Sequence, residues 1–167
     1  QRFFNRSRPT DARPTELTTR KVGDLMAREP VVCGPEDTVQ EAARKMRAAH
    51  VSSIGITAPD GALTGLVTTR DLSNKVLAEG LPGDTPVSAI MSRDLVSLPP
   101  TALGSDVLNL MLERRIGHMP ITENGRLVGM ITQTDITRFQ ALTSSALIRD
   151  IAGADAVAEL AEVTRRI

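Results

Sequence analysis

The residues best suited to chemistry in this sequence occur twice and in the same order. The segment GLVTTRD ends at Asp71, and the segment GMITQTD ends at Asp135. In each copy an apolar pair leads to a threonine, Thr68 or Thr132, and the aspartate follows three residues later. A carboxylate can accept hydrogen bonds from the two vicinal hydroxyls of a ribose, and a threonine hydroxyl can donate one to a phosphate oxygen. The start of a helix also favours an anion. The pattern therefore predicts two matched nucleotide sites, in which both aspartates contribute to affinity.

The same spacing also has a purely structural explanation. A threonine followed three residues later by an aspartate, ahead of an apolar helix, forms a capping box that satisfies the free amides of the first turn. For one copy alone, capping is the more common explanation. A glycine three residues before the threonine, Gly65 or Gly129, recurs in both copies although capping does not require it. We therefore favour binding, and one threonine can serve both purposes.

The elements that must position these motifs also occur twice. A repeat of about 60 residues is too long for a solenoid unit and too short for two large domains. We therefore predict an α/β fold in which two β-α-β-β-α repeats share one core about a pseudo-two-fold axis, followed by a C-terminal helical tail. In copy one the expected elements are a helical turn at 22–26, a strand at 31–33, a helix at 36–49, strands at 53–57 and 63–68, and a helix from 69 to about 80. In copy two they are a turn at 87–91, a strand at 95–98, a helix at 101–114, strands at 118–122 and 126–132, and a helix from 133 to about 142.

Composition divides the chain into four parts, namely 1–19, 20–81, 82–142 and 143–167. The first part is rich in Arg and contains Pro9 and Pro14, which favours a basic linker over an arm that binds nucleic acid. The middle two parts are the repeats. The last part has an amphipathic helical pattern interrupted at Gly153, and its apolar face must pack against the repeats, a second copy or a further domain. Because the chain opens on Gln1, we expect it to be part of a longer protein.

The sequence lacks the residues that several other classes of function require. The formal net charge is zero, so no overall field attracts nucleic acid or an anionic membrane. Three Phe with no Tyr or Trp do not make a stacking platform for single strands, and no apolar run is long enough to span a membrane. The single Cys33 fits a cytoplasmic protein and a buried packing role. With only His50 and His118 beside it, no metal site is expected, and no nucleophile elbow or phosphate loop occurs. We expect no enzyme activity.

The doubled motif, together with the segment IGHMPIT at 116–122, resembles a pair of CBS (cystathionine β-synthase) domains. The resemblance covers about residues 20–142 and is specific because the motifs occur twice in register. It implies two repeats packed through their sheets, with clefts that take adenosine-type ligands such as AMP or ATP as regulatory ligands and hold no cofactor. By match of motif, the ribose contact falls on both motif aspartates and the phosphate contact on both motif threonines.

Five further residues are candidate nucleotide contacts. Val32 and Val96 lie on the apolar strands expected to sandwich the base. Ser53 begins the second strand of copy one, and Gly117 and Pro120 flank the start of the corresponding strand in copy two.

The chain departs from the family pattern at the expected phosphate cation. Many nucleotide-binding members carry a basic residue three positions before the proline of this strand, where the sequence has Gly117. His118 is the nearest candidate cation, although a single histidine at a strand start is more often structural. Copy one has Ser53 and Gly55 at the matching positions. We therefore predict that the cleft holding the second motif binds phosphate-bearing ligands more tightly, with an affinity that falls between pH 6 and 8.

These observations predict a regulatory module that senses an adenine nucleotide and transmits its occupancy to attached domains, as a homodimer. The flanks resemble parts of a longer bacterial protein type, in which the pair lies between a cyclic-nucleotide-binding domain and a nucleotidyltransferase-like region. The alternative is a structural module that dimerises a larger protein and binds nothing. Any catalysis would lie in a downstream domain, because the chain has no clustered carboxylates for metal ions.

Overall fold

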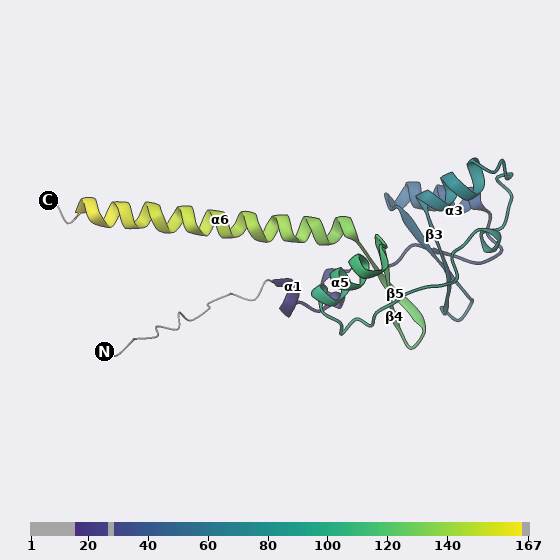
Figure 1. The fold of residues 1–167 in the computed structure, drawn as a ribbon, viewed down its shortest axis with the longest axis horizontal. Coiled ribbons are helices and arrows are strands. Elements are labelled where there is room, and N and C mark those ends of the chain that lie inside the picture. Colours follow the sequence, from purple (N-terminus) through teal and green to yellow (C-terminus); the bar gives the residue numbers. More distant parts are fainter. Residues whose placement is uncertain (1–15, 27–28, 165–167) are drawn as a thin grey trace, which may run out of the picture.

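The computed structural model describes residues 16–26 and 29–164, with the side chains of most residues beyond 145 outside that description (Figure 1). The predicted linker lies outside the described residues except at its end, where 16–19 form a helical turn. The first group of elements comprises α1 (Glu16–Thr19), α2 (Val22–Leu25), β1 (Val32–Cys33), α3 (Val39–Ala49), β2 (Ser53–Thr57), β3 (Leu63–Thr68), α4 (Thr69–Asp71) and the π-helix η1 (Leu72–Leu77). The second comprises the 3-10 helix η2 (Val87–Ala89), α5 (Gly104–Arg114), β4 (His118–Glu123), β5 (Arg126–Thr132) and α6 (Gln133–Thr164). The predicted α/β fold with two repeats is confirmed.

Local sequence accounts for the regular elements. Helix α3 begins at a complete capping box, in which Thr38 and Glu41 exchange hydrogen bonds of 2.8 and 3.1 Å. It ends where His50 adopts a left-handed conformation at φ 54°. Strand β1 pairs in parallel with β2, and β2 pairs antiparallel with β3, whereas β4 and β5 form a two-stranded hairpin. The alternating apolar residues of these hairpins become the buried face of each sheet.

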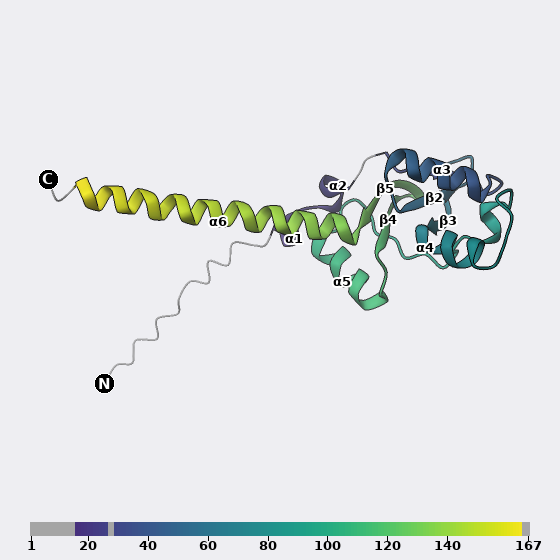
Figure 2. The same cartoon turned by 90° about the horizontal axis from the view of Figure 1, so that it is seen from above.

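Two sequence predictions about elements are wrong. The strand expected at 95–98 is reduced to one parallel bridge between Leu98 and Ile121. The next two residues are Pro99 and Pro100, which have no N–H with which to extend the pairing. The helix expected to end near residue 142 continues to Thr164, and Gly153 does not interrupt it. One glycine in an alanine-rich helix costs about 1 kcal/mol, which is too little to end it. The helix extends away from the body of the molecule (Figures 1 and 2).

The helical segment that precedes each repeat packs on the other repeat. Val22 N–H donates to Ala102 O at 2.7 Å, ahead of α5 in the second repeat. Val87 N–H donates to Asp37 O at 2.8 Å, ahead of α3 in the first repeat. The core of the first repeat therefore includes residues that follow it in the chain, and it consists of Cys33, Val39, Ala42, Met46, Ile54, Ile56, Val67, Val87, Ile90 and Met91. The core of the second includes residues that precede the first, and it consists of Leu17, Val22, Val107, Met111, Met119, Ile121, Ile131 and Ile136.

The two sheets meet through their hairpin turns. Leu63 N–H donates to Gly125 O at 3.0 Å, and Leu127 N–H donates to Gly61 O at 3.2 Å. Gly55 on β2 faces Leu127, and a Cβ at Gly55 would overlap the Leu127 side chain. The first repeat therefore has glycine where the second has proline because the other repeat packs against that position. Figure 2 shows the two hairpins side by side.

Candidate functional site

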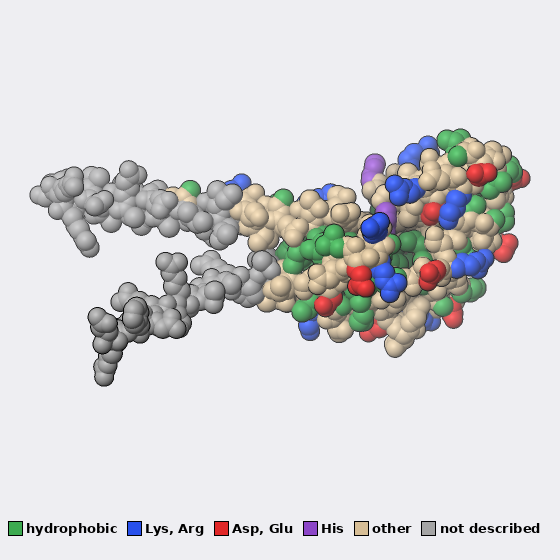
Figure 3. All heavy atoms as spheres, viewed as in Figure 1, with side chains coloured by type: hydrophobic (Ala, Val, Ile, Leu, Met, Phe, Trp, Pro, Cys, Tyr) green, Lys and Arg blue, Asp and Glu red, His purple; other side chains and the backbone are tan. Residues whose placement is uncertain are grey.

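A cavity of about 810 Å³ lies between the two repeats. The first repeat contributes the junction of β3 and α4, and the second contributes residues 94–96, the end of α5 and the start of β4. Figure 3 shows acidic, basic and histidine side chains around apolar surface in this part of the molecule. Six of the residues singled out in the sequence line it, namely Thr68, Asp71, Val96, Gly117, His118 and Pro120. Four do not, namely Val32, Ser53, Thr132 and Asp135. The first motif therefore places its threonine and aspartate in the cavity, whereas the second contributes only Gln133.

The sequence grouped these residues differently. It placed His118 and Pro120 in one cleft with the second motif, because all of them belong to the second repeat. In the structure His118 does lie beside the second motif, since it pairs with Thr132 across the β4–β5 hairpin. His118 and Pro120 also line the same cavity as Thr68 and Asp71 of the first motif, which the sequence did not predict. The physical reason is that the repeats pack face to face, so each wall of the cavity comes from a different repeat.

Both motifs form complete capping boxes. Thr68 N–H donates to Asp71 Oδ2 at 2.9 Å, and Asp71 N–H donates to Thr68 Oγ1 at 3.2 Å. In the second motif the same two bonds join Thr132 and Asp135 at 2.9 and 3.1 Å. Capping therefore explains the threonine-to-aspartate spacing in both copies. It leaves the second carboxylate oxygen of each aspartate available for another partner.

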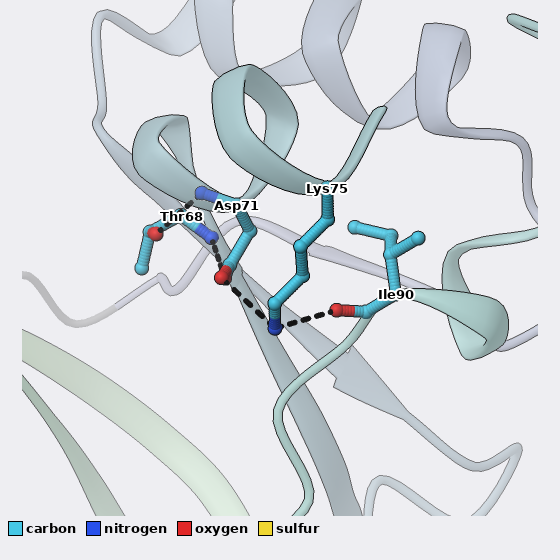
Figure 4. A network of polar contacts seen from close by, with 4 residues as sticks. All are labelled: Thr68, Asp71, Lys75 and Ile90. Carbon is cyan, nitrogen blue, oxygen red and sulfur yellow. Dashed lines mark hydrogen bonds and ion pairs between the residues drawn. The ribbon is translucent and has the colours of Figure 1, made fainter. Parts of the chain in front are cut away.

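For Asp71, in the first motif, this second oxygen has a partner in Lys75. Lys75 Nζ lies 3.2 Å from Asp71 Oδ1, and it also donates to Ile90 O at 3.1 Å (Figure 4). The Asp71 side chain is 14% exposed and that of Lys75 is 45% exposed. Among the described residues no cation forms an ion pair with Asp135, because the position equivalent to Lys75 is Phe139. The two matched carboxylates thus have different electrostatic surroundings.

His118 links the repeats at the edge of the cavity. Its Nε2 lies 2.9 Å from Ser52 Oγ in the first repeat. Burial lowers the pKa of His118, and the nearby carboxylates of Asp71 and then Asp135 oppose that effect. The lowered pKa favours the neutral imidazole and moves its change of charge to lower pH, which weakens the case for a charged phosphate contact at this residue.

Two arginines of this cavity were not predicted from the sequence. Arg70 lies inside the first motif, and Arg115 follows α5 in a left-handed conformation at φ 54°; both line the cavity. Arg70 could have been recognised in the sequence, since the residue before the motif aspartate is basic in copy one only. Arg115 carries no comparable sequence signal, because it lies outside both motifs and only the folding of α5 brings it to the cavity. The cavity also includes one carboxylate outside the motif, that of Asp94.

The motif glycine has a packing role. A Cβ at Gly65 would lie 2.7 Å from Met91 Cγ and closer still to its sulfur. Met91 comes from the segment that crosses onto the first repeat, so the glycine makes room for it. In the first copy the glycine therefore has a packing role that involves no ligand.

The structure also bears on the cysteine, on metal binding and on membrane-spanning helices. Cys33 is 3% exposed, and burial, assisted by the Asp37 charge, raises its pKa to about 11, so it is a packing residue as predicted. Among the described residues, His, Cys, Asp and Glu side chains form no group of three able to hold a metal ion. None of the described helices has both the length and the apolar character needed to cross a membrane.

Comparison with known proteins identifies the family. The family model described as the CBS domain matches twice, at residues 22–78 and 87–142. The chain belongs to the CBS domain family. It is similar to the CBS domain-containing protein YhcV of Bacillus subtilis, with 35% identity over 125 residues that cover 75% of this chain and 89% of that protein.

The CBS pair also has relatives among solved structures. An uncharacterized conserved protein from Pyrococcus horikoshii is 33% identical, with a TM-score of 0.68 over 72% of this chain and 92% of that one. The CBS domain pair of protein MJ0100, in complex with 5′-methylthioadenosine and S-adenosyl-L-methionine, has a TM-score of 0.66 over 71% of this chain and 94% of that one. At 24% identity, the second likeness is one of fold. CBS domain pairs are regulatory modules in general and not catalytic ones.

Proposed function

We propose that this CBS pair is a sensor that binds an adenine nucleotide in the cavity between its repeats. In this proposal Asp71 accepts hydrogen bonds from the ribose hydroxyls, and the Thr68 hydroxyl and Arg70 and Arg115 bind phosphate. The base lies against the apolar wall that includes Val96. The nucleotide is a regulatory ligand of the AMP, ADP or ATP type and not a cofactor.

The observation that carries the proposal is that a single cavity combines all three kinds of contact. A diol acceptor and a cation from the first repeat face a cation and an apolar wall from the second. The volume of about 810 Å³ is in the range of small-molecule sites, about 300–1,000 Å³. A second CBS pair of the same fold has been crystallised with two adenosine-derived ligands, which supports the class of ligand proposed.

Regulation follows from the location of the cavity. A ligand that contacts both repeats stabilises the relative orientation in which both contacts are made, by the difference in its affinity for the two arrangements. We propose that α6 transmits this change to attached domains of a longer cytoplasmic protein, since it begins at the second motif and extends away from the body. We also propose a homodimer, because large apolar side chains such as Leu112 and Leu142 are 64% and 65% exposed on α5 and α6.

The test uses the matched aspartates as variant and control. Calorimetry with AMP, ADP, ATP and adenosine should show binding to the wild-type protein. Asp71→Ala should weaken adenosine and AMP binding by roughly 1.5–3 kcal/mol, since it removes a charge-assisted hydrogen bond to the diol. Asp135→Ala alters the same kind of capping box but does not remove a side chain that lines the cavity, so its effect on this affinity, through His118, should be much smaller.

The result also decides the alternative function. Absence of binding to any of the four ligands at millimolar concentration, together with a dimer in sedimentation, would support a structural dimerisation module that binds no nucleotide. A monomer at tens of micromolar would contradict the homodimer.

A further inference from the structure

Lys75 joins the candidate diol acceptor to a distant segment of the chain. Its ammonium contacts Asp71 Oδ1 at 3.2 Å and Ile90 O at 3.1 Å, so one side chain bridges two elements (Figure 4). Ile90 is 5% exposed and belongs to the core of the first repeat. The backbone carbonyl that accepts from Lys75 is therefore held in place by packing.

The segment that contains Ile90 continues into the opposite wall of the cavity. Two residues further on, Ser92 exchanges backbone hydrogen bonds of 2.9 and 3.0 Å with Leu66 on β3. Residues 94–96 then line the cavity across from the motif. Lys75 thus connects Asp71 on one side of the cavity to the start of the wall on the other.

We propose that Lys75 is a positioning residue of the nucleotide site, which orients the Asp71 carboxylate and holds the segment 90–96 in place. This inference rests on the proposed function. Thr68 N–H contacts Asp71 Oδ2 and Lys75 contacts Oδ1, so the carboxylate group is held in one orientation. A carboxylate that is already ordered loses less conformational freedom when it accepts ribose hydroxyls.

The second repeat provides the internal contrast. Phe139 occupies the position equivalent to Lys75 and packs against the core of that repeat. An apolar ring makes neither of the two polar contacts, so Asp135 has no equivalent restraint. Positioning of the motif carboxylate by a lysine is thus a property of the first repeat alone.

The test compares three variants in the full chain. Lys75→Met keeps the aliphatic stem and removes the charge, Lys75→Arg restores a cation, and Asn74→Ala alters an exposed neighbour on the same helix. Calorimetry with adenosine and with AMP should show that Lys75→Met weakens both by the same factor, about tenfold. The arginine variant should recover most of that loss, and Asn74→Ala should match the wild type.

Equal losses for the two ligands matter because a direct phosphate contact would affect AMP alone. A loss confined to AMP would overturn the positioning role and make Lys75 a phosphate ligand. Unchanged or tighter binding of both ligands would also overturn it, since Lys75 would then be neutral or would compete with the ribose.

A second measurement needs no ligand. Amide hydrogen exchange at Met91 and Ser92 should become about fivefold faster in Lys75→Met, and it should not change in Asn74→Ala. If the wild-type protein binds neither adenosine nor AMP, the proposed function fails and the positioning of a ligand fails with it. The exchange rates still test whether Lys75 holds the segment 90–96 in place, because unchanged rates in Lys75→Met would show that it does not.

Discussion

The two repeats have the same capping box and the same hairpin, but only the first presents its threonine and aspartate to the cavity between them, whereas the second motif contributes Gln133. In the first repeat Asp71 interacts with Lys75 and faces the arginine-lined cavity. In the second, Phe139 replaces the lysine and Asp135 lies outside that cavity. A repeated motif can thus keep its local structure while the surrounding packing places the threonine and aspartate of one copy in the cavity. The capping box is the local part, because it depends only on residues within one helical turn.

The β2 and β4 strands provide a second contrast between the repeats. Gly55 N–H donates to Val31 O at 3.0 Å and its α-carbon faces Leu127, whereas Pro120 occupies the equivalent position in the second repeat and lines the cavity. The first repeat therefore has a true parallel strand at β1, and the second has only the bridge at Leu98.

The largest expected effect comes from making the first repeat like the second at this position. Gly55→Pro removes the hydrogen bond to Val31 and places a ring against Leu127, so it should lower the free energy of unfolding by about 3 kcal/mol or more. Urea denaturation measures this difference. The reciprocal Pro120→Gly should cost less, about 2 kcal/mol, because it removes a fully buried ring and increases the freedom of the unfolded chain. Equal costs for the two changes would show that packing between the repeats does not decide the choice of residue.

The next effect distinguishes the apolar contact of one repeat from the polar contact of the other. Phe139→Ala should lower the free energy of unfolding by about 2 kcal/mol, because the half-buried ring packs against the second core. Lys75→Ala should cost less than about 1 kcal/mol, since its ion pair is partly exposed to solvent. Thermal and urea denaturation of both variants make the comparison. A larger loss for Lys75→Ala would mean that the lysine is mainly a stabilising residue.

The capping threonines should behave alike in stability and differently in binding. Thr68→Ala and Thr132→Ala each remove one side-chain cap, which should cost about 1 kcal/mol in the free energy of unfolding. Only Thr68→Ala should weaken nucleotide binding, because Thr132 does not line the cavity. If Thr132→Ala weakened AMP binding as much, the two motifs would have to be treated as equivalent sites.

The smallest effect concerns pH. Burial lowers the pKa of His118, so below its ordinary value of about 6.5 the unfolded chain takes up a proton before the folded protein does. This group therefore contributes full stability above about pH 6.5 and loses it as the pH falls toward the lowered value. His118→Gln should remove that part of the decrease between pH 7 and 5. His50→Asn, which alters the other histidine, serves as the control, and a flatter pH profile in the control instead would contradict the assignment.

Local sequence patterns are sufficient to predict the two repeats, the order of their elements and the capping residues. The strands 53–57, 63–68 and 126–132 were predicted at the bounds that the structure shows, because alternating apolar residues and turn residues act over a few positions. Five of the ten candidate site residues line the cavity for a similar reason, since the doubled motif and the start of the β4 strand are local features. Val96 also lines it, although the strand predicted around it is absent from the described elements.

Only the tertiary structure decided which motif faces the cavity and which residues lie opposite it. The pairing of Asp71 with His118 and Arg115, the contact of Lys75 with Ile90 and the overlap of Gly65 with Met91 all join residues from segments that cross between repeats. No local pattern encodes these contacts. They arise because each repeat buries apolar faces against the other repeat. Each also buries them against the segment that precedes the other repeat in the chain.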